Sequence, residues 1–224
     1  MEQRFKRNIP TISEEEQALL RTKRAVIIGC GGLGGYIAEF LARAGVGGLT
    51  LVDGDVFEES NLNRQTLALE CNIGMSKAKA AAERVKTIDS AIDVRFAEEF
   101  FTAENAAEIL KDADIVMDAL DNIPARLLLE DECAARGLIL VHGAVQGWAA
   151  QVCVSEAGSG VLHRIYGSST GGHADKSVLS PVPPFCAAMQ CAEALKKLCG
   201  RKSEAEGKLI AADMRSMDIV CIEL

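Results

Sequence analysis

The sequence predicts an α/β protein whose mostly parallel sheet is covered by helices on both faces and ends in a short antiparallel C-terminal extension. Short apolar runs alternate with segments of helical periodicity along most of the chain. The first run leads into the glycine-rich string GCGGLGG at residues 29–35, and the second ends in Asp53. A strand, a glycine loop, a helix and a second strand ending in an acidic residue are typical of a Rossmann-like nucleotide-binding fold.

The remaining elements are expected in a regular order. A first helix over residues 12–22 has Ser13 as N-cap and Glu16 at the capping-box position. Strands are expected at residues 25–30, 48–53, 93–97, 113–119, 137–145, 149–155, 208–212 and 218–223. Helices are expected at residues 36–44, 75–88, 104–111, 124–136 and 185–199. These elements form one domain over residues 1–224 with a long crossover loop at 156–184, and loops of that length are usually functional.

Composition and charge limit the class of protein. The chain has 224 residues, of which 49% are hydrophobic and 25% charged, which suits one globular domain. No signal-like or membrane-length apolar run occurs, so we expect a cytoplasmic protein without a membrane partner. The net charge of −8 makes nucleic-acid binding an unfavoured expectation. The eight cysteines are scattered among apolar neighbours, which favours reduced, buried thiols over disulfides.

The glycine loop is the first candidate binding site. Gly29, Gly31, Gly32 and Gly34 satisfy the pattern G-x-G-x-x-G between a strand and a helix. Glycine permits a tight turn and a close approach of backbone to ligand, and the N-terminus of the next helix offers N–H groups to phosphate. Asp53 is placed to accept hydrogen bonds from ribose hydroxyls. The motif predicts an adenine nucleotide and does not by itself separate NAD from ATP.

Polar residues after later strands favour ATP over NAD. The string DGDVFEESNLNRQ follows the second strand, Lys77 begins the next helix, and Asp121 and Asn122 follow the strand at 113–119. An arginine and a lysine beside the glycine loop suit a triphosphate whose charge is redistributed during reaction. Carboxylates in the same crevice suit Mg²⁺. The candidates within the string itself are Asp53, Asp55, Asn61, Arg64 and Gln65.

On these motifs the sequence resembles the ThiF/MoeB/HesA family, the bacterial relatives of ubiquitin-activating E1 enzymes. The resemblance spans nearly the whole chain, and its most specific parts are GCGGLGG, DGDVFEESNLNRQ, GMSK and DALDN. It implies ATP-dependent adenylation of the C-terminal glycine carboxylate of a small ubiquitin-like sulfur-carrier protein ending in Gly-Gly, with release of pyrophosphate. It also implies a homodimer. The pathway, thiamin or molybdopterin biosynthesis among others, stays open.

The resemblance further implies residue roles. Asp53 would bind ribose, while Asp55 and Asp121 would place Mg²⁺ or the attacking carboxylate. Arg7, in the string RFKRN, would extend across the dimer interface into the ATP site of the partner. The residues expected to hold the phosphates are Asn61, Arg64, Gln65 and Lys77. The residues that we expect to be catalytic are Arg7, Arg64, Lys77 and Asp121, and Asn122 joins the nucleotide-binding set.

The sequence departs from the family pattern at its cysteines. Family members often carry two C-x-x-C pairs for a structural zinc, and this spacing occurs nowhere in the chain, so we expect no structural zinc site. Some members carry a crossover-loop cysteine that takes the activated protein covalently, and the loop string GSSTGGHADKSVLSP has none. Cys186 is the best candidate for a reactive thiol, although a buried structural cysteine is the favoured interpretation.

Three alternatives stay beside this interpretation. An NAD(P)-dependent oxidoreductase would explain the glycines and Asp53 but would give no role to Arg64, Lys77 and Asp121. An adenylating dehydratase acting on a tRNA-linked carboxylate shares the core chemistry, and the acidic composition argues against it. A non-catalytic E1-like scaffold would bind nucleotide or a partner without turnover, and the intact Arg64, Lys77 and Asp121 set argues against that.

Overall fold

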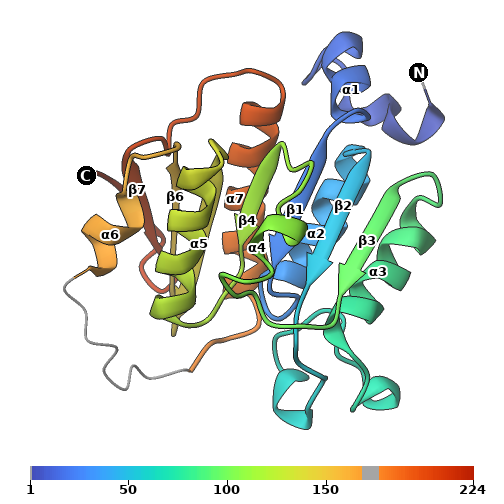
Figure 1. The fold of residues 1–224 in the computed structure, drawn as a ribbon, viewed down its shortest axis with the longest axis horizontal. Coiled ribbons are helices and arrows are strands. Elements are labelled where there is room, and N and C mark those ends of the chain that lie inside the picture. The colour runs from blue at the N-terminus through green and yellow to red at the C-terminus, as the bar shows by residue number, and fades with distance from the viewer. Residues whose placement is uncertain (1, 168–176) are drawn as a thin grey trace.

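A single mixed sheet organises the computed structural model, which describes residues 2–167 and 177–224 (Figure 1). Within these residues the sheet has eight strands in the order β3-β2-β1-β4-β5-β6-β7-β8. The strands are β1 (Arg24–Ile28), β2 (Gly48–Val52), β3 (Asp93–Ala97), β4 (Ile115–Asp118), β5 (Leu140–Gln146), β6 (Ala149–Ser155), β7 (Lys208–Asp213) and β8 (Asp218–Glu223). The helices are α1 (Glu14–Leu20), α2 (Gly34–Ala44), α3 (Lys77–Ile88), α4 (Ala106–Ile109), α5 (Ile123–Ala135), α6 (Val161–Tyr166) and α7 (Val182–Leu198). The described part of the chain also forms three short 3-10 helices, η1 (Gln3–Asn8), η2 (Glu59–Asn61) and η3 (Glu70–Asn72).

The strand order confirms the predicted fold class. Strands β1 to β5 pair in parallel, whereas β6, β7 and β8 pair antiparallel. The chain runs outward from β1 through β2 to β3 on one side and then returns to continue through β4 and β5 on the other. The point where the order reverses therefore lies between β1 and β4. Open α/β sheets bind ligands at such a point, outside the carboxyl ends of the strands.

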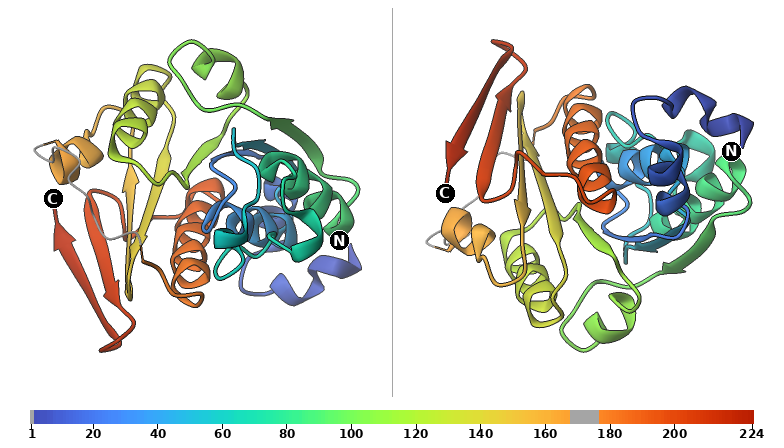
Figure 2. Two further views of the ribbon diagram at one scale, coloured as in Figure 1. Left: turned by 90° about the horizontal axis from the view of Figure 1, so that it is seen from below. Right: turned by 90° about the horizontal axis from the view of Figure 1, so that it is seen from above.

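Helices cover both faces of the parallel part of the sheet (Figure 2). Alternate residues of a strand point to opposite faces, and the two hydrophobic cores divide the strands in this way. Ile27 and Met117 belong to the core shared with α2, α3 and α7, whereas Ile28 and Val116 belong to the core shared with α4, α5 and α6. Both faces of β1 and β4 are thus buried, which explains why their sequences are continuously apolar.

The β7–β8 hairpin differs from the rest of the sheet. It projects beyond the helices at one end of the molecule (Figure 2), and every residue of β8 is exposed. Neither hydrophobic core includes a residue of β8. The antiparallel extension predicted from the sequence is therefore an added edge rather than a part of the packed interior.

Local sequence signals explain where most helices begin and end. Ser13 and Glu16 form the predicted capping box of α1. The side chain of Ser76 caps α3 by accepting a hydrogen bond from the backbone of Lys79. Helix α2 ends at Ala44 and is followed by the C-cap residue Gly45, whose φ of 95° lies in the left-handed region that favours glycine.

The expected crossover loop at 156–184 is only partly a loop. Helix α6 lies inside it, and α7 begins at Val182 instead of residue 185. The sequence gives little sign of α6 because its six residues make fewer than two turns, too short for a clear helical period. Helix α7 carries prolines at its first positions, where a missing N–H costs no helical hydrogen bond. Residues 168–176 of this segment lie outside the described residues.

Candidate active site

The glycine loop joins β1 to α2 at the carboxyl ends of the central strands. Gly29 has a φ of 96°, and a Cβ atom there would lie 2.6 Å from the carbonyl oxygen of Ala119. A Cβ atom at Gly34 would lie 1.8 Å from the carbonyl oxygen of Gly29. These two glycines are required by packing alone, because no side-chain rotation could relieve a clash with backbone. They also place the turn after β4 directly against the loop.

Gly31 and Gly32 have a different environment. A Cβ atom at Gly32 would make only ordinary contacts, with Pro183 at 3.8 Å and Arg64 at 4.0 Å. A Cβ atom at Gly31 would lie 3.4 Å from the Gln65 amide nitrogen. The fold itself tolerates side chains here, so these glycines suit a loop that leaves its backbone open to a ligand. The same contacts place Arg64 and Gln65 beside the loop, as the sequence predicted.

Asp53 is held against the glycine loop by backbone groups. Its Oδ2 accepts a hydrogen bond of 2.7 Å from the N–H of Cys30, and its Oδ1 accepts one of 2.8 Å from the N–H of Asp55. Burial raises the pKa of the Asp53 carboxyl, and these two N–H groups and the Lys77 ammonium oppose that shift. A carboxylate has about four lone-pair sites, so both oxygens retain capacity for ribose hydroxyls.

Lys77 is the buried cation of this region. Its side chain is only 9% exposed, and its Nζ lies 3.1 Å from Oδ2 of Asp55, whose side chain is 55% exposed. A backbone hydrogen bond of 3.1 Å from the Lys77 N–H to the Asp55 carbonyl fixes the same two residues to each other. The Asp55 carboxylate expected to place Mg²⁺ is therefore the ion-pair partner of the lysine expected to bind phosphate. A buried ammonium with a half-exposed partner suits an anion arriving from solvent.

Asn61, Arg64 and Gln65 follow one another at the turn formed by η2. Asn61 is buried, and its side-chain oxygen accepts a hydrogen bond from the N–H of Glu58. Arg64 is half-buried and donates to the carbonyl of Ser60 at 3.0 Å. The Gln65 side-chain oxygen is buried without a hydrogen-bond partner. Such an acceptor costs about 1–3 kcal/mol, and its position beside Gly31 suits a ligand that brings a donor.

Asp121 and Asn122 belong to the turn between β4 and α5, which we call the Asp121 turn (residues 119–122). Both residues are exposed. Ala119 packs on Gly29, so this turn borders the glycine loop as predicted. The side-chain oxygen of Asn122 caps α5 by accepting a hydrogen bond of 2.9 Å from the N–H of Ala125. This bond gives Asn122 a structural role in addition to the nucleotide contact that we expected.

Arg7 lies far from these residues in its own chain. It lines a hollow that also contains Ala44, the last residue of α2, whereas Gly34 at the other end of α2 adjoins the glycine loop. An 11-residue helix is about 16 Å long. In Figure 1 the N-terminal segment accordingly lies at the top and the arrowheads of β2 and β3 point to the lower side. Arg7 therefore does not join the site of its own chain.

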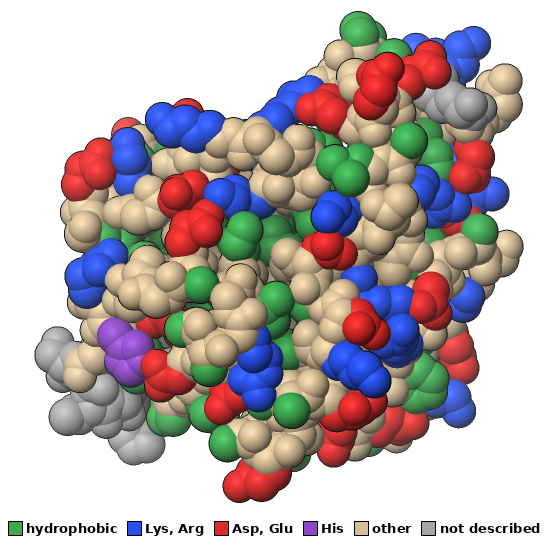
Figure 3. Space-filling model, turned by 45° about the horizontal axis from the view of Figure 1, so that its top comes forward, with side chains coloured by type: hydrophobic (Ala, Val, Ile, Leu, Met, Phe, Trp, Pro, Cys, Tyr) green, Lys and Arg blue, Asp and Glu red, His purple; other side chains and the backbone are tan. Residues whose placement is uncertain are grey.

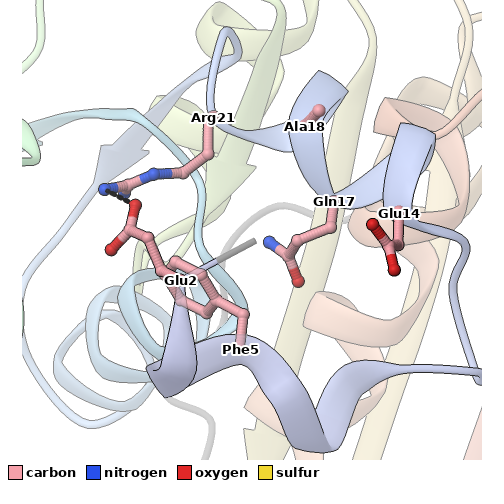
Figure 4. A pocket seen from close by; sticks show the side chains of 6 residues that line it. All are labelled: Glu2, Phe5, Glu14, Gln17, Ala18 and Arg21. Atoms are coloured by element: carbon pink, nitrogen blue, oxygen red, sulfur yellow. Dashed lines mark hydrogen bonds and ion pairs between the residues drawn. The ribbon is translucent and has the colours of Figure 1, made fainter.

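The N-terminal segment is held to the body of the protein by a small ion network. Buried Asp89 pairs with Arg4 at 2.7 Å and with Arg21 at 2.9 Å. Arg21 also pairs with Glu2 and lies over the ring of Phe5, as Figure 4 shows in the hollow between η1 and α1. This hollow is remote from the glycine loop. The network fixes the segment that carries Arg7.

A buried polar cluster beside the Asp121 turn was missed at the sequence level. Asp118 and His142 are register partners on β4 and β5, and both are fully buried. The Asp118 Oδ2 lies 2.6 Å from Nδ1 of His142, and Nε2 of His142 lies 3.0 Å from the Tyr166 hydroxyl. Gln151 donates to that hydroxyl, and Arg126 lies over the Tyr166 ring. The sequence signal that could have revealed this cluster is an aspartate and a histidine within strands that are otherwise apolar.

Cys186 is buried inside the protein. It is the fifth residue of α7, beyond the first turn in which a helix dipole acts on a thiol. Its Sγ lies 3.5 Å from the carbonyl of Gln151, and burial raises its pKa to about 12. Cys186 is thus a protonated interior thiol in this structure. All eight cysteines are free, and Cys71 and Cys221 are the exposed ones.

Metal-binding side chains do not gather in the part of the chain that the structure describes. Within residues 2–167 and 177–224, no three His, Cys, Asp or Glu side chains are grouped so that they could hold a metal ion. Asp55 and Asp121 alone therefore do not make a protein-only metal site. Mg²⁺ is commonly bound by one or two carboxylates together with substrate phosphates, and that arrangement fits these residues. The same described residues include no helix that could span a membrane.

Comparison with known proteins agrees with this geometry. Residues 5–223 match the ThiF family. The chain belongs to the ThiF family. The match covers almost the whole chain, which confirms the resemblance drawn from GCGGLGG and the motifs that follow it.

Curated relatives and solved structures extend the comparison. The adenylyltransferase and sulfurtransferase MOCS3 of Xenopus laevis is 34% identical over 211 residues, covering 92% of this chain and 47% of that protein. The SAMP-activating enzyme E1 of Haloferax volcanii is 32% identical over 221 residues, covering 96% of this chain and 82% of that protein. The chain spans about half the length of the MOCS3 proteins it matches. By their names, the first relative is an adenylyltransferase and the second an E1 activating enzyme.

Two solved structures from E. coli share the fold. MccB with ATP has a TM-score of 0.83 at 21% identity and covers 100% of this chain and 72% of that chain. The tRNA N6-threonylcarbamoyladenosine dehydratase TcdA has a TM-score of 0.74 at 25% identity, and the match covers 88% of this chain and 95% of that chain. Both likenesses confirm the Rossmann-like E1 fold.

Proposed function

We propose that this ThiF-family chain adenylates the C-terminal glycine carboxylate of a small ubiquitin-like sulfur-carrier protein. The observation that carries the proposal is the buried Lys77 ammonium beside a glycine loop and a backbone-held Asp53. A dehydrogenase binds a pyrophosphate that stays intact and has no need of such a cation. The names of the Haloferax and Xenopus relatives support the same class of reaction.

The reaction joins two anions. A carboxylate oxygen of the carrier attacks the α-phosphorus of ATP, the bond from that phosphorus to the bridging oxygen of the β-phosphate breaks, and pyrophosphate leaves with the electron pair. The main requirements are alignment of the reactants and neutralisation of charge on the leaving group. No side-chain nucleophile takes part in this step.

The residues divide these tasks according to their positions. Asp53 accepts hydrogen bonds from the ribose hydroxyls, and the open backbone at Gly31 and Gly32 faces the phosphates. Lys77 and Arg64 neutralise phosphate charge, with Lys77 exchanging its ion pair with Asp55 for a phosphate contact. Gln65 and Asn61 complete the polar wall next to the glycine loop. Asn122 orients the Asp121 turn through its cap on α5.

Mg²⁺ would be held by Asp55 and Asp121 together with phosphate oxygens, and it would supply charge neutralisation at the leaving group. Asp121, on the turn after β4, would contribute one of the two carboxylates.

A two-fold homodimer completes the proposed site, with Arg7 acting in the partner's site. The distance between Arg7 and its own glycine loop supports this arrangement, because an arginine at the far end of α2 lies away from the site of its own chain. The test mixes Arg7→Ala and Arg64→Ala protomers. Random pairing should restore about a quarter of the wild-type activity, since half of the dimers would carry one intact site. No recovery in verified mixed dimers would contradict action in trans.

The main experiment measures exchange of labelled pyrophosphate into ATP. We expect exchange that requires a small ubiquitin-like protein ending in Gly-Gly and that disappears when its last two glycines are removed. The truncated carrier keeps the globular docking surface and is the matched control. Exchange that is equally fast without any carrier would contradict the proposed substrate.

A second candidate substrate is a carboxylate attached to tRNA. The likeness to TcdA, of which this chain covers 95%, favours it. The net charge of −8 opposes it, and on the face shown in Figure 3 acidic and basic side chains are intermingled. Replacing the carrier by tRNA bearing N6-threonylcarbamoyladenosine in the same assay separates the two. Conversion of the modified tRNA to its cyclised form would favour the dehydratase.

A further inference from the structure

A chain of hydrogen bonds with one consistent direction runs through the buried cluster. Gln151 donates to the Tyr166 hydroxyl, which can donate to Nε2 of His142, while Nδ1–H of His142 donates to Oδ2 of Asp118. Each atom then has the role that its chemistry allows. This pattern requires a neutral His142 protonated on Nδ1.

The electrostatics of the cluster favour the same protonation state. Burial lowers the pKa of His142, and the positive charge of Arg126 acts in the same direction, while Asp118 and Glu130 oppose it. The Arg126 Nε lies 3.8 Å from Oδ2 of Asp118. With His142 neutral, the Asp118 and Arg126 charges balance, which a buried cluster requires.

The cluster is connected to the Asp121 turn at two points. The Oδ1 of Asp118 accepts a hydrogen bond of 2.9 Å from the N–H of Leu120. The guanidinium of Arg126 donates a hydrogen bond of 2.7 Å to the carbonyl of the same Leu120. Both backbone groups of the residue before Asp121 are therefore held by the side chains that His142 and Tyr166 orient.

The far end of the cluster is also fixed. Tyr166 ends α6, and the carboxylate of Glu130, one turn after Arg126 on α5, accepts hydrogen bonds from the N–H groups of Leu162 and His163 in the first turn of α6. Helix α5 thus holds α6 at both ends, by Glu130 at its start and Arg126 under its last ring. These contacts hold the Tyr166 side chain in one position, and the Tyr166 hydroxyl in turn holds the ring of His142.

We infer that His142 is a positioning residue for the adenylation step: through Asp118 it sets the backbone of the Asp121 turn and hence the direction in which Asp121 faces the reactants. The inference rests on the proposed function for its kinetic consequence. Its structural part, control of the Asp121 turn by the Nδ1–H donor of His142, does not depend on which carboxylate is adenylated.

The test uses two substitutions that separate the ring nitrogens. In His142→Asn the side-chain amide falls near the place of Nδ1 and can still donate to Asp118. In His142→Leu no donor remains and Asp118 loses its partner. The matched control is His163→Leu, because His163 also pairs with a carboxylate, Asp131 at 2.8 Å, but on the exposed side of α6.

We expect His142→Leu to lower kcat for pyrophosphate exchange about 100-fold, because misplacement of a reacting group by about 1 Å has that effect. KM for ATP should change much less, since Asp53 and Lys77, which are expected to hold the nucleotide, bond to groups outside the buried cluster. His142→Asn should recover most of kcat, and His163→Leu should behave as wild type. Hydrogen–deuterium exchange at the Leu120 amide should accelerate in His142→Leu and return toward wild type in His142→Asn.

Two results would overturn the inference. One is that the Leu120 amide exchanges its hydrogen as slowly in His142→Leu as in the wild type. The other is that His142→Asn shows no higher kcat and no slower exchange at Leu120 than His142→Leu, with the melting temperatures of both lowered equally. His142 would then be a packing residue only. If the wild-type protein shows no carrier-dependent exchange, the proposed function fails, and the Leu120 measurement still decides whether His142 controls the turn.

Discussion

Compared with the nucleotide side of the site, the Asp121 turn is supported by contacts between side chains more than by bonds to backbone groups. On the nucleotide side, which comprises the glycine loop, Asp53, Asp55 and Lys77, the backbone N–H groups of Cys30 and Asp55 hold Asp53. Behind the turn, side chains of β4, α5, β5, β6 and α6 contact one another. The first arrangement uses backbone groups that any loop residue offers, whereas the second exists only when particular side chains face each other across β4 and β5.

This difference has a consequence for function. The nucleotide side can be recognised from motif spacing, because a strand, a loop and a helix N-terminus bring their own backbone groups to the phosphate. The turn side depends on buried polar groups that must all be satisfied together. We therefore expect substitutions on the nucleotide side to affect binding and charge neutralisation, and those behind the turn to affect alignment.

The largest expected effect is on the nucleotide side. Lys77→Ala should lower the rate of pyrophosphate exchange by about two to three orders of magnitude, the usual effect of losing one preorganised donor. Lys79→Ala, two residues along the same helix and exposed, is the matched control and should exchange normally. An unimpaired Lys77→Ala variant would show that the phosphate site has been placed wrongly.

The next largest effect is expected at the glycine loop, where packing requires Gly34 but not Gly32. Gly34→Ala should lower the free energy of unfolding by about 1–3 kcal/mol, because the new Cβ atom forces backbone apart. Gly32→Ala should unfold like wild type, since its Cβ atom meets only ordinary contacts. Its affinity for ATP, measured by calorimetry, should nevertheless fall. A Gly32→Ala variant that binds ATP normally would mean that the loop backbone does not approach the phosphates.

The buried histidine predicts a pH dependence on the turn side. Because folding lowers the pKa of His142, the unfolded chain binds the extra proton more readily, and stability should be lost as pH falls below about 6.5. This single group contributes a slope of at most about 1.4 kcal/mol per pH unit. The charged groups acting on it are Asp118, Arg126 and Glu130.

Urea unfolding between pH 7.5 and pH 5 checks this prediction. The side chain introduced by His142→Asn does not titrate in this range, so the stability of this variant should fall less steeply than that of the wild type. Parallel curves for the two proteins would show that His142 is not the titrating group.

The smallest expected effect concerns Cys186. Its thiol is buried with a pKa raised to about 12, so Cys186→Ser should adenylate its carrier at an unchanged rate. Iodoacetamide should modify Cys71 and Cys221 in the native protein and spare Cys186. Normal adenylation combined with abolished acyl transfer would instead indicate a covalent second step at Cys186.

Particular residues show how far the sequence could be interpreted. The glycine loop, Asp53, Asp55 and Lys77 were predicted to adjoin one another, and the structure brings them together. The Asp121 turn was correctly expected beside the loop, because carboxyl ends of neighbouring parallel strands meet at one edge of a sheet. Helix α6 was missed, since the acceptor for its first N–H groups is Glu130 from another helix, whereas its N-cap residue Gly160 makes no side-chain cap bond.

By itself the sequence determined the Rossmann-like fold, its family and the composition of the nucleotide side, because apolar periodicity and loop chemistry act over short stretches of chain. Only the tertiary structure decided that Asp118 and His142 face each other and that Tyr166 closes the cluster. It also decided that Arg7 lies at the far end of α2. These relations depend on the pairing of β4 with β5 and on the packing of α5 against α6. Long-range packing of this kind has no periodic signal in the chain.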